Sequence, residues 1–292
     1  MSRIADTFAS LKRENRRGFI PFITAGDPDL DTTRELIVEL ARAGATLIEL
    51  GIPFTDPMAD GPVIQRASER ALRHDFGIAE VLRLVSEARK KTDVPIILFS
   101  YFNPLLQFCL EDGRTSPPSK QTDLRLEAGL VPPSVNFEKL AVKAKQAGVD
   151  GVLVTDLVPE EAGEFAAILR ANDLDMIFLI APTSTDERLK LVAEHASGFI
   201  YAVSRAGITG AREEMSAEAE KLVRRMRRFS DLPVAVGFGI SKPEHVVDVW
   251  SYADAAVVGS AIVSEIENAG GAAEAVSRVA KFVRELLEQE GT

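Results

Sequence analysis

The sequence of 292 residues contains one cysteine, one tryptophan, three histidines and no long apolar run. A single cysteine, Cys109, excludes a disulfide within the chain. No stretch reaches the roughly 18 apolar residues of a membrane-spanning helix, and the first residues lack the apolar core of a signal peptide. We therefore expect a cytoplasmic protein that does not enter a membrane.

Basic residues are in the minority. Lysine and arginine number 34 against 44 aspartates and glutamates, and the net charge is -10. A chain this acidic argues against a general nucleic-acid surface. The histidines, His74, His195 and His245, lie in helical patterns without the spacing of metal ligands, so we expect no metal site.

Short apolar segments alternate with longer amphipathic segments along the chain. The apolar segments predict strands at residues 18–24, 46–51, 95–101, 151–155, 176–181, 198–203, 233–238 and 255–259. The amphipathic segments predict helices at residues 30–43, 62–73, 78–91, 137–147, 160–171, 186–194, 217–229, 243–250, 261–267 and 272–290. Eight strand–helix units favour an α/β TIM barrel, with a doubly wound open sheet as the alternative.

One domain is expected to hold the whole chain. Its length and its hydrophobic content of 46% allow either one barrel or two smaller domains. The repeated units favour a single (β/α)8 barrel over residues 1–292, with an extra N-terminal helix. Pro21 lies inside the first predicted strand and has no N–H to donate, which predicts a local irregularity there.

Residues 111–136 interrupt the alternation after the third predicted strand. The segment is rich in proline, serine and charged residues, as is typical of a functional loop or a disordered insert. Because we expect it to leave the C-terminal end of a strand, it would emerge on the barrel face that carries active sites. We interpret it as a flexible flap that adjusts partner docking or substrate access.

Residues 49–62 place three acidic side chains and three prolines directly after an apolar strand. Alternation puts Glu49 on the same face as Leu47, where a core side chain would lie. An unpaired buried carboxyl keeps its proton, and the raised pKa suits a general acid or base. The alternative is a glutamate at a frayed strand end that faces water. The prolines restrict the loop and so would hold Asp56 and Asp60 in place.

Glycine clusters follow the last three predicted strands, at residues 204–210, 237–241 and 259–261. Glycine lets backbone N–H groups approach an anion, and a helix N-terminus adds a favourable dipole. TIM barrels commonly bind phosphate with the loops after strands seven and eight. One cluster alone favours a tight turn. Three at consecutive strand ends predict a phosphate site.

Residues 19–28, 49–65, 204–211, 237–241 and 259–263 together resemble the tryptophan synthase alpha subunit family. The resemblance covers nearly the whole chain apart from the insert. It implies a carbon–carbon lyase of tryptophan biosynthesis that cleaves indole-3-glycerol phosphate to indole and glyceraldehyde 3-phosphate by a retro-aldol reaction. Another phosphosugar barrel, such as an isomerase or epimerase, is the alternative, but it would need different catalytic residues at its strand ends.

The resemblance also assigns roles to individual residues. Glu49 matches the general acid/base that protonates the indole ring, and Asp60 matches the carboxylate that binds the indole N–H and stabilises positive charge on the ring. Phe22 and Tyr101 match walls of the indole site, although both are also ordinary residues for a barrel core. The remaining matches are Thr209, in a loop that closes over the substrate, and the phosphate contacts Gly210, Gly239, Gly259 and Ser260.

A partner is implied as well. The family's indole passes to a beta subunit that carries pyridoxal phosphate, so we expect a heterotetramer of two alpha and two beta chains and no cofactor in this chain. The expected interface residues are Pro53, Asp56, Pro57 and Asn103. The insert departs from the family pattern near that surface and leaves the docking open. The alternative function is a subunit that chiefly activates the beta subunit allosterically and is weakly active alone.

Overall fold

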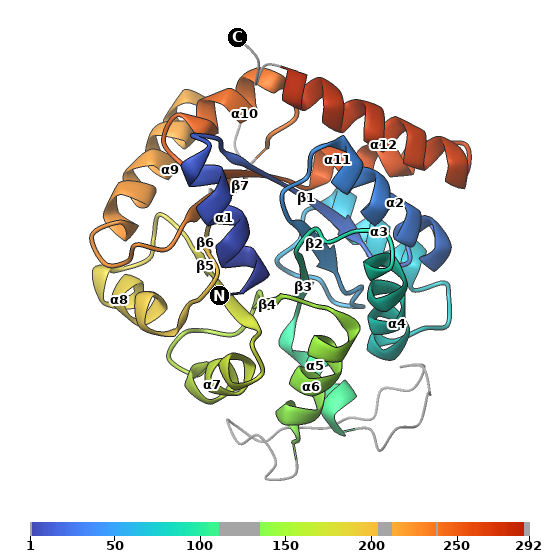
Figure 1. Ribbon diagram of the computed structural model, residues 1–292, viewed down its shortest axis with the longest axis horizontal. Coiled ribbons are helices and arrows are strands. Elements are labelled where there is room, and N and C mark those ends of the chain that lie inside the picture. The colour runs from blue at the N-terminus through green and yellow to red at the C-terminus, as the bar shows by residue number, and fades with distance from the viewer. Residues whose placement is uncertain (1, 111–134, 204–211, 238, 289–292) are drawn as a thin grey trace.

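The computed structural model describes residues 2–110, 135–203, 212–237 and 239–288. Eight parallel strands close into a barrel in chain order (Figure 1), which confirms the predicted TIM barrel. The strands are β1 (Gly18–Thr24), β2 (Ile48–Gly51), β3 (Ile96–Ser100), β4 (Gly151–Val154), β5 (Asp175–Ile180), β6 (Ile200–Val203), β7 (Val234–Gly237) and β8 (Ala255–Val258).

Helices surround the strands (Figure 1). They are α1 (Arg3–Arg13), α2 (Leu30–Ala43), α3 (Pro62–Ala71), α4 (Ile78–Arg89), α5 (Phe102–Leu110), α6 (Phe137–Ala147), α7 (Gly163–Ala171), α8 (Asp186–His195), α9 (Arg212–Met226), α10 (Pro243–Trp250), α11 (Ser260–Glu267) and α12 (Ala272–Leu287). Within the described ranges, none of them combines the length and the apolar character needed to cross a membrane.

Local chemistry explains several helix boundaries. Helix α2 begins after Asp29, whose side chain accepts a hydrogen bond from the Thr32 N–H, and it ends at Gly44 in the left-handed conformation with φ of 113°. Helix α9 begins five residues before its predicted start, at Arg212 rather than 217. Its first residues are charged, so the apolar periodicity that predicts a helix begins later than the helix itself.

Helix α5 was not predicted. Its sequence is apolar almost throughout, so it lacks the polar face that reveals a helix, and Pro104 lies in the first turn, where a missing N–H is tolerated. This helix corrects the expectation that the insert leaves the end of a strand, because α5 separates residues 111–136 from β3. Residues 111–134 lie outside the described residues, and Asn136 caps α6 by accepting a hydrogen bond from the Lys139 N–H at 3.0 Å.

Strand β1 runs unbroken through Pro21. Its residues 18–21 are in register with β8, and residues 22–24 are in register with β2. The residue without an N–H donor therefore lies where the pairing passes from one neighbour to the other. The predicted irregularity does not interrupt the strand.

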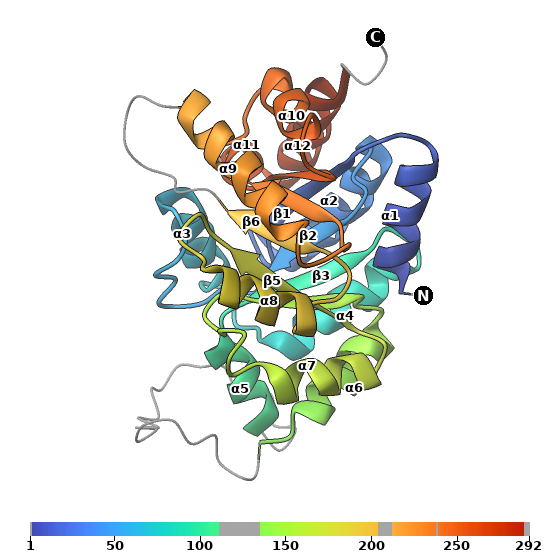
Figure 2. The same cartoon turned by 90° about the vertical axis from the view of Figure 1, so that its left-hand side faces the viewer.

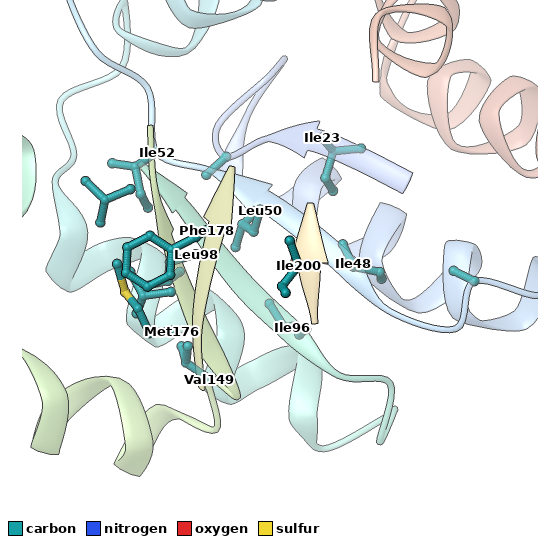
Figure 3. Packing of buried hydrophobic residues seen from close by; sticks show 14 of the residues in the cluster. Ile23, Ile48, Leu50, Ile52, Ile96, Leu98, Val149, Met176, Phe178 and Ile200 are labelled. Atoms are coloured by element: carbon teal, nitrogen blue, oxygen red, sulfur yellow. The ribbon is translucent and has the colours of Figure 1, made fainter. Parts of the chain in front are cut away.

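The barrel wall is apolar on both sides. Alternate strand residues point outward to the helices, and Figure 3 shows Ile48, Leu50, Ile96 and Leu98 in this outer cluster. The intervening residues point into the barrel and form a second cluster, which includes Ile20, Leu47, Ile97, Leu153, Ile177, Phe199, Ala235 and Val257. Burial on both sides explains why the strands appear in the sequence as short, nearly continuous apolar runs.

Helix α1 closes the N-terminal end of the barrel. Ile4, Phe8 and Leu11 join the inner cluster, and the ring centroid of Phe8 lies 5.8 Å from that of Phe199. Figure 2 shows α1 at one end of the barrel and α3 at the other. The predicted extra N-terminal helix therefore plugs one end, and the C-terminal ends of the strands are left for a site.

Candidate active site

Glu49 points into the barrel from β2, as the alternation predicts. It is only 1% exposed and is in register with Phe22 of β1 and Ile97 of β3. Its Oε1 atom is buried and has no hydrogen-bond partner among the described residues. Burial raises the pKa of Glu49 well above its ordinary value. This shift favours the protonated form of the carboxyl, which is the form that can act as a general acid.

Tyr201 lies near Glu49 and was not identified as a site residue from the sequence. Burial, with a smaller contribution from the charge of Glu49, raises the pKa of Tyr201 well above its ordinary value. Gly237 makes room for this side chain, because a Cβ atom there would lie 2.4 Å from the Tyr201 hydroxyl oxygen. The available signal was the alternation of Phe199, Tyr201 and Val203 along β6, which puts a polar hydroxyl on the inward face.

Phe22 forms an apolar wall beside Glu49. It is 5% exposed and packs against Phe99 in an edge-to-face arrangement, with ring centroids 5.2 Å apart. A Cβ atom on Gly51 would lie 2.5 Å from the Phe22 ring, so a glycine is needed for this close approach. Phe22 and Phe99 thus form an apolar wall next to Glu49, and the contact of Phe22 with an indole ring stays a prediction.

Asp60 is joined to Tyr101. The Tyr101 hydroxyl donates to Asp60 Oδ2 at 3.3 Å and accepts a hydrogen bond from the Ala59 N–H at 2.8 Å. Gln65 supports the loop from helix α3, where its Nε2 donates to the backbone oxygen of Asp60 at 3.0 Å. Burial raises the pKa of Asp60 to about 6, although the Tyr101 hydrogen bond partly opposes this shift. The carboxyl is ionised at neutral pH.

The predicted interface residues lie around this loop. Asp56 and Asn103 are exposed, and Pro53 and Pro57 are partly exposed. Met58 is 84% exposed, which is unusual for a large apolar side chain. The Asp60 loop therefore presents both polar and apolar groups to the surroundings.

The predicted phosphate contacts are partly described. Gly259 and Ser260 form the start of α11, and a Cβ atom on Gly259 would lie 3.7 Å from both Phe22 and Ile64. Gly239 is exposed and has φ of 47°, in the left-handed region that favours glycine. The start of α11 thus directs backbone N–H groups to the end of the barrel that carries the Phe22 wall. Thr209 and Gly210 lie outside the described residues.

Other polar features lie elsewhere or are dispersed. The described part of the chain has no group of three or more histidine, cysteine, aspartate or glutamate side chains arranged to hold a metal ion. A crevice of about 450 Å³ lies at the N-terminal end of the barrel, and Phe8, Arg17, Arg227 and Leu232 are among its lining residues. It contains none of the predicted site residues, so it is separate from the candidate active site.

Sequence comparison identifies one family. The profile of the tryptophan synthase alpha chain family matches residues 8–115 and 132–290, and the gap between these ranges falls inside the predicted insert. The tryptophan synthase alpha chain of Solibacter usitatus is 46% identical over 286 residues, which cover 98% of this chain and 97% of the relative. The tryptophan synthase alpha chain of Geobacter sulfurreducens is 45% identical over 291 residues, which cover 100% of this chain and 100% of the relative.

Solved structures agree with the sequence comparison. The tryptophan synthase alpha subunit of Legionella pneumophila matches with a TM-score of 0.83 at 34% identity, over 99% of this chain and 98% of its own. A chain of the tryptophan synthase a2b2 complex of Pyrococcus furiosus matches with a TM-score of 0.78 at 40% identity, over 93% of this chain and 98% of its own. This chain belongs to the tryptophan synthase alpha chain family.

Proposed function

We propose that this chain catalyses the alpha reaction of tryptophan synthase, the cleavage of indole-3-glycerol phosphate to indole and glyceraldehyde 3-phosphate. The observation that carries the proposal is the Glu49 carboxyl, which is 1% exposed and whose Oε1 has no partner among the described residues. A core carboxyl of this kind is costly to bury and is typical of a catalytic acid.

Glu49 acts first as the acid. Its carboxyl gives a proton to the ring carbon that bears the glycerol side chain, and the ring then carries a positive charge. The bond between that carbon and the side chain breaks, and its electron pair returns to the ring and restores the neutral indole. The adjacent side-chain hydroxyl becomes the aldehyde carbonyl and releases its proton. The Glu49 carboxylate accepts that proton, which returns the enzyme to its starting state.

Asp60 stabilises the charged ring. Its pKa of about 6 leaves it ionised at neutral pH, so it can accept a hydrogen bond from the indole N–H and oppose the positive charge that develops. Tyr101 orients this carboxylate through the hydrogen bond of 3.3 Å to Oδ2. The difference between the two environments assigns the roles, since burial without a partner favours the protonated form of Glu49, whereas Asp60 is ionised at neutral pH.

The rest of the substrate is held by an apolar wall and a helix N-terminus. Phe22 and Tyr101 contact the indole ring, and the phosphate binds at Gly259 and Ser260, where backbone N–H groups and the helix dipole favour an anion. Gly239 and Gly210 complete this phosphate-binding set, and Thr209 belongs to the loop that closes over the substrate. The chemistry consists of proton transfer and charge stabilisation, so it uses no cofactor in this chain.

The proposed assembly is a heterotetramer with two alpha and two beta chains, in which pyridoxal phosphate belongs to the beta subunit. The Pyrococcus furiosus relative is described as part of an a2b2 complex with mutual activation. The exposed residues Asp56 and Asn103 and the partly exposed Pro53 and Pro57 support a contact surface beside the active-site loop, with Met58 as an apolar anchor. Residues 1–292 are proposed to form one domain.

The test is an assay of the purified chain with indole-3-glycerol phosphate, in which indole and glyceraldehyde 3-phosphate are measured separately. Equal amounts of the two products support the lyase, and a chain that releases neither product contradicts it. The assay is repeated while a beta subunit is titrated. The mutual activation described for the relative makes an activating subunit the second candidate. Tryptophan formation that rises while indole release by this chain stays negligible would favour that role.

A further inference from the structure

Arg70 on helix α3 joins three separate segments of the chain. Its Nε and Nη2 atoms donate to the two carboxylate oxygens of Asp27, each at 2.8 Å. Its Nη1 atom donates to Glu267 Oε1 at 2.8 Å. The Asp27 side chain is 0% exposed, so this bidentate pair lies in the interior. All three guanidinium nitrogens are therefore engaged in a fixed geometry.

Each of the three segments leads to a different part of the proposed site. Asp27 follows β1, which carries Phe22. Helix α3 follows the Asp60 loop and is tied to it by the Gln65 hydrogen bond of 3.0 Å. Glu267 ends helix α11, whose first residue is Ser260. One side chain thus connects the supports of the indole wall, the Asp60 carboxylate and the phosphate-binding helix.

The same three elements meet a second time, nearer the site. Phe22 of β1, Ala67 of α3 and Val263 of α11 form a small buried cluster of their own. One apolar contact region alone would let packed helices slide or rotate against each other. The ion pairs of Arg70 add a second point of attachment along α3, one turn beyond Ala67, and so fix the relative orientation of the elements.

We propose that Arg70 is a positioning residue that keeps the Asp60 loop aligned with β1, through Asp27, and with the start of α11. This inference rests on the proposed function, because the substrate must reach Asp60 with its ring and α11 with its phosphate. Without the arginine, the substrate still binds by its phosphate, but its ring meets a displaced Asp60. A displacement of about 1 Å in such a site can lower the rate by about 10²-fold.

Arg66 provides a matched control. It lies one turn earlier on the same helix and binds the same Glu267 through Nε and Nη2, both at 2.7 Å. Its side chain is 48% exposed, against 23% for Arg70, and it makes no hydrogen bond with Asp27. Loss of Arg66 leaves Asp27, α3 and Glu267 joined through Arg70, whereas loss of Arg70 removes both hydrogen bonds to Asp27 and leaves the Arg66–Glu267 pair between α3 and α11.

The experiment compares Arg70→Met, Arg66→Met and the double variant Asp27→Asn/Arg70→Met with the wild-type chain. Steady-state cleavage gives kcat and KM, binding of inorganic phosphate alone reports on the phosphate end, and circular dichroism gives the folded fraction. We expect kcat of Arg70→Met to fall about 10- to 100-fold. Phosphate affinity should stay within about twofold of wild type, and Arg66→Met should change each quantity by no more than about twofold.

The double variant separates positioning from simple damage. It leaves no buried carboxylate without its arginine, so it should fold even where Arg70→Met does not. A low kcat in the folded double variant supports the inference. Recovery of kcat in the double variant, or equal kcat values for Arg70→Met and Arg66→Met, would overturn it. A wild-type chain without lyase activity contradicts the proposed function, and the inference then falls with it.

Discussion

Asp150 and Glu49, two buried carboxyl groups at opposite ends of the barrel, differ in their partners. At the N-terminal end, Asp150 is 5% exposed, and its carboxylate accepts hydrogen bonds from the Ile96 N–H and from Arg89 and Arg3. At the C-terminal end, Glu49 is buried as deeply, and its Oε1 has no partner among the described residues. Burial raises the pKa of both groups, but hydrogen bonds and two arginines partly offset the desolvation of Asp150, whereas no described partner does so for Glu49.

The same contrast extends to neighbouring groups. Asp175, at the start of β5, accepts a hydrogen bond of 2.5 Å from the Ser2 hydroxyl, which fastens the start of α1 to the barrel. Thr24, at the end of β1, has a buried hydroxyl oxygen without a partner in the described part of the chain. One end is therefore built for stability and the other retains unsatisfied polar groups for chemistry, as is general for TIM barrels.

The largest expected effect comes from Glu49→Gln, which removes the acid and keeps its shape. We expect kcat to fall by about 10² to 10⁴. The thermal stability should not fall, because the variant removes a buried ionisable group. In the wild type the pKa of Glu49 is higher in the folded than in the unfolded chain, so its contribution to the unfolding free energy decreases as pH rises above 4.5.

Measurements of indole release and of thermal unfolding at several pH values test both statements. The stability of Glu49→Gln relative to wild type should increase with pH. Glu161→Gln is the control, since Glu161 is exposed. Wild-type turnover in Glu49→Gln would contradict the role of Glu49 as the catalytic acid at the C-terminal end.

Asp60→Asn should lower kcat by about 10² to 10³, because an amide cannot oppose the ring charge as a carboxylate does. In the wild type, activity should rise with pH through about 6, as Asp60 ionises. The variant should lose this acidic limb. Asp56→Asn, an exposed change in the same loop, is the control when the alpha chain is assayed alone. A pH profile that is the same in wild type and Asp60→Asn would contradict the assigned role.

Asp150→Ala tests the stable end of the barrel. Removing one partner of a buried ion pair should lower the unfolding free energy by about 3 to 5 kcal/mol, because Arg89 and the Ile96 N–H lose their acceptor. The kcat of the folded fraction should remain unchanged. Denaturant unfolding provides the measurement, and Asp231→Ala, an exposed change at the same end, should alter stability by no more than about 0.5 kcal/mol. A lower kcat in folded Asp150→Ala would contradict the conclusion that this end of the barrel serves stability and not catalysis.

The smallest effect is expected for Tyr101→Phe. Loss of the hydrogen bond should raise the activation free energy by about 0.5 to 1.5 kcal/mol, which lowers kcat/KM about 2- to 13-fold. Because this bond lowers the pKa of Asp60, the acidic limb of the pH profile should move above its wild-type midpoint of about 6. Titration of activity against pH measures the shift. An unmoved limb would mean that Tyr101 does not act on Asp60.

Much of the fold could be predicted from local patterns. Short apolar runs between amphipathic segments located all eight strands. The alternation of side chains along the second strand placed Glu49 on the inward face. Helix α5 escaped prediction because an apolar helix has no polar face to mark its period. The glycine cluster at residues 259–261 indicated a phosphate site, but the substrate and the role of Asp60 came from the resemblance to a family, since a pattern of residue types does not name a substrate.

Contacts between distant parts of the chain could not be predicted in this way. Tyr201 of β6 lies near Glu49 of β2 only because the sheet closes into a barrel. Arg70 lies 43 residues from Asp27 and 197 residues from Glu267, and nothing in the local pattern pairs them. Each of these contacts depends on the register of strands and on the packing of helices, which are properties of the assembled fold.

The sequence by itself determined the strands, the inward direction of Glu49 and the family, because these depend on residue types at short spacings. The tertiary structure decided which buried carboxyl groups have partners. Asp150 meets its two arginines, whereas Glu49 meets apolar walls and Tyr201. The physical reason is that desolvation and pairing depend on neighbours in space, and the closure of the barrel chooses those neighbours.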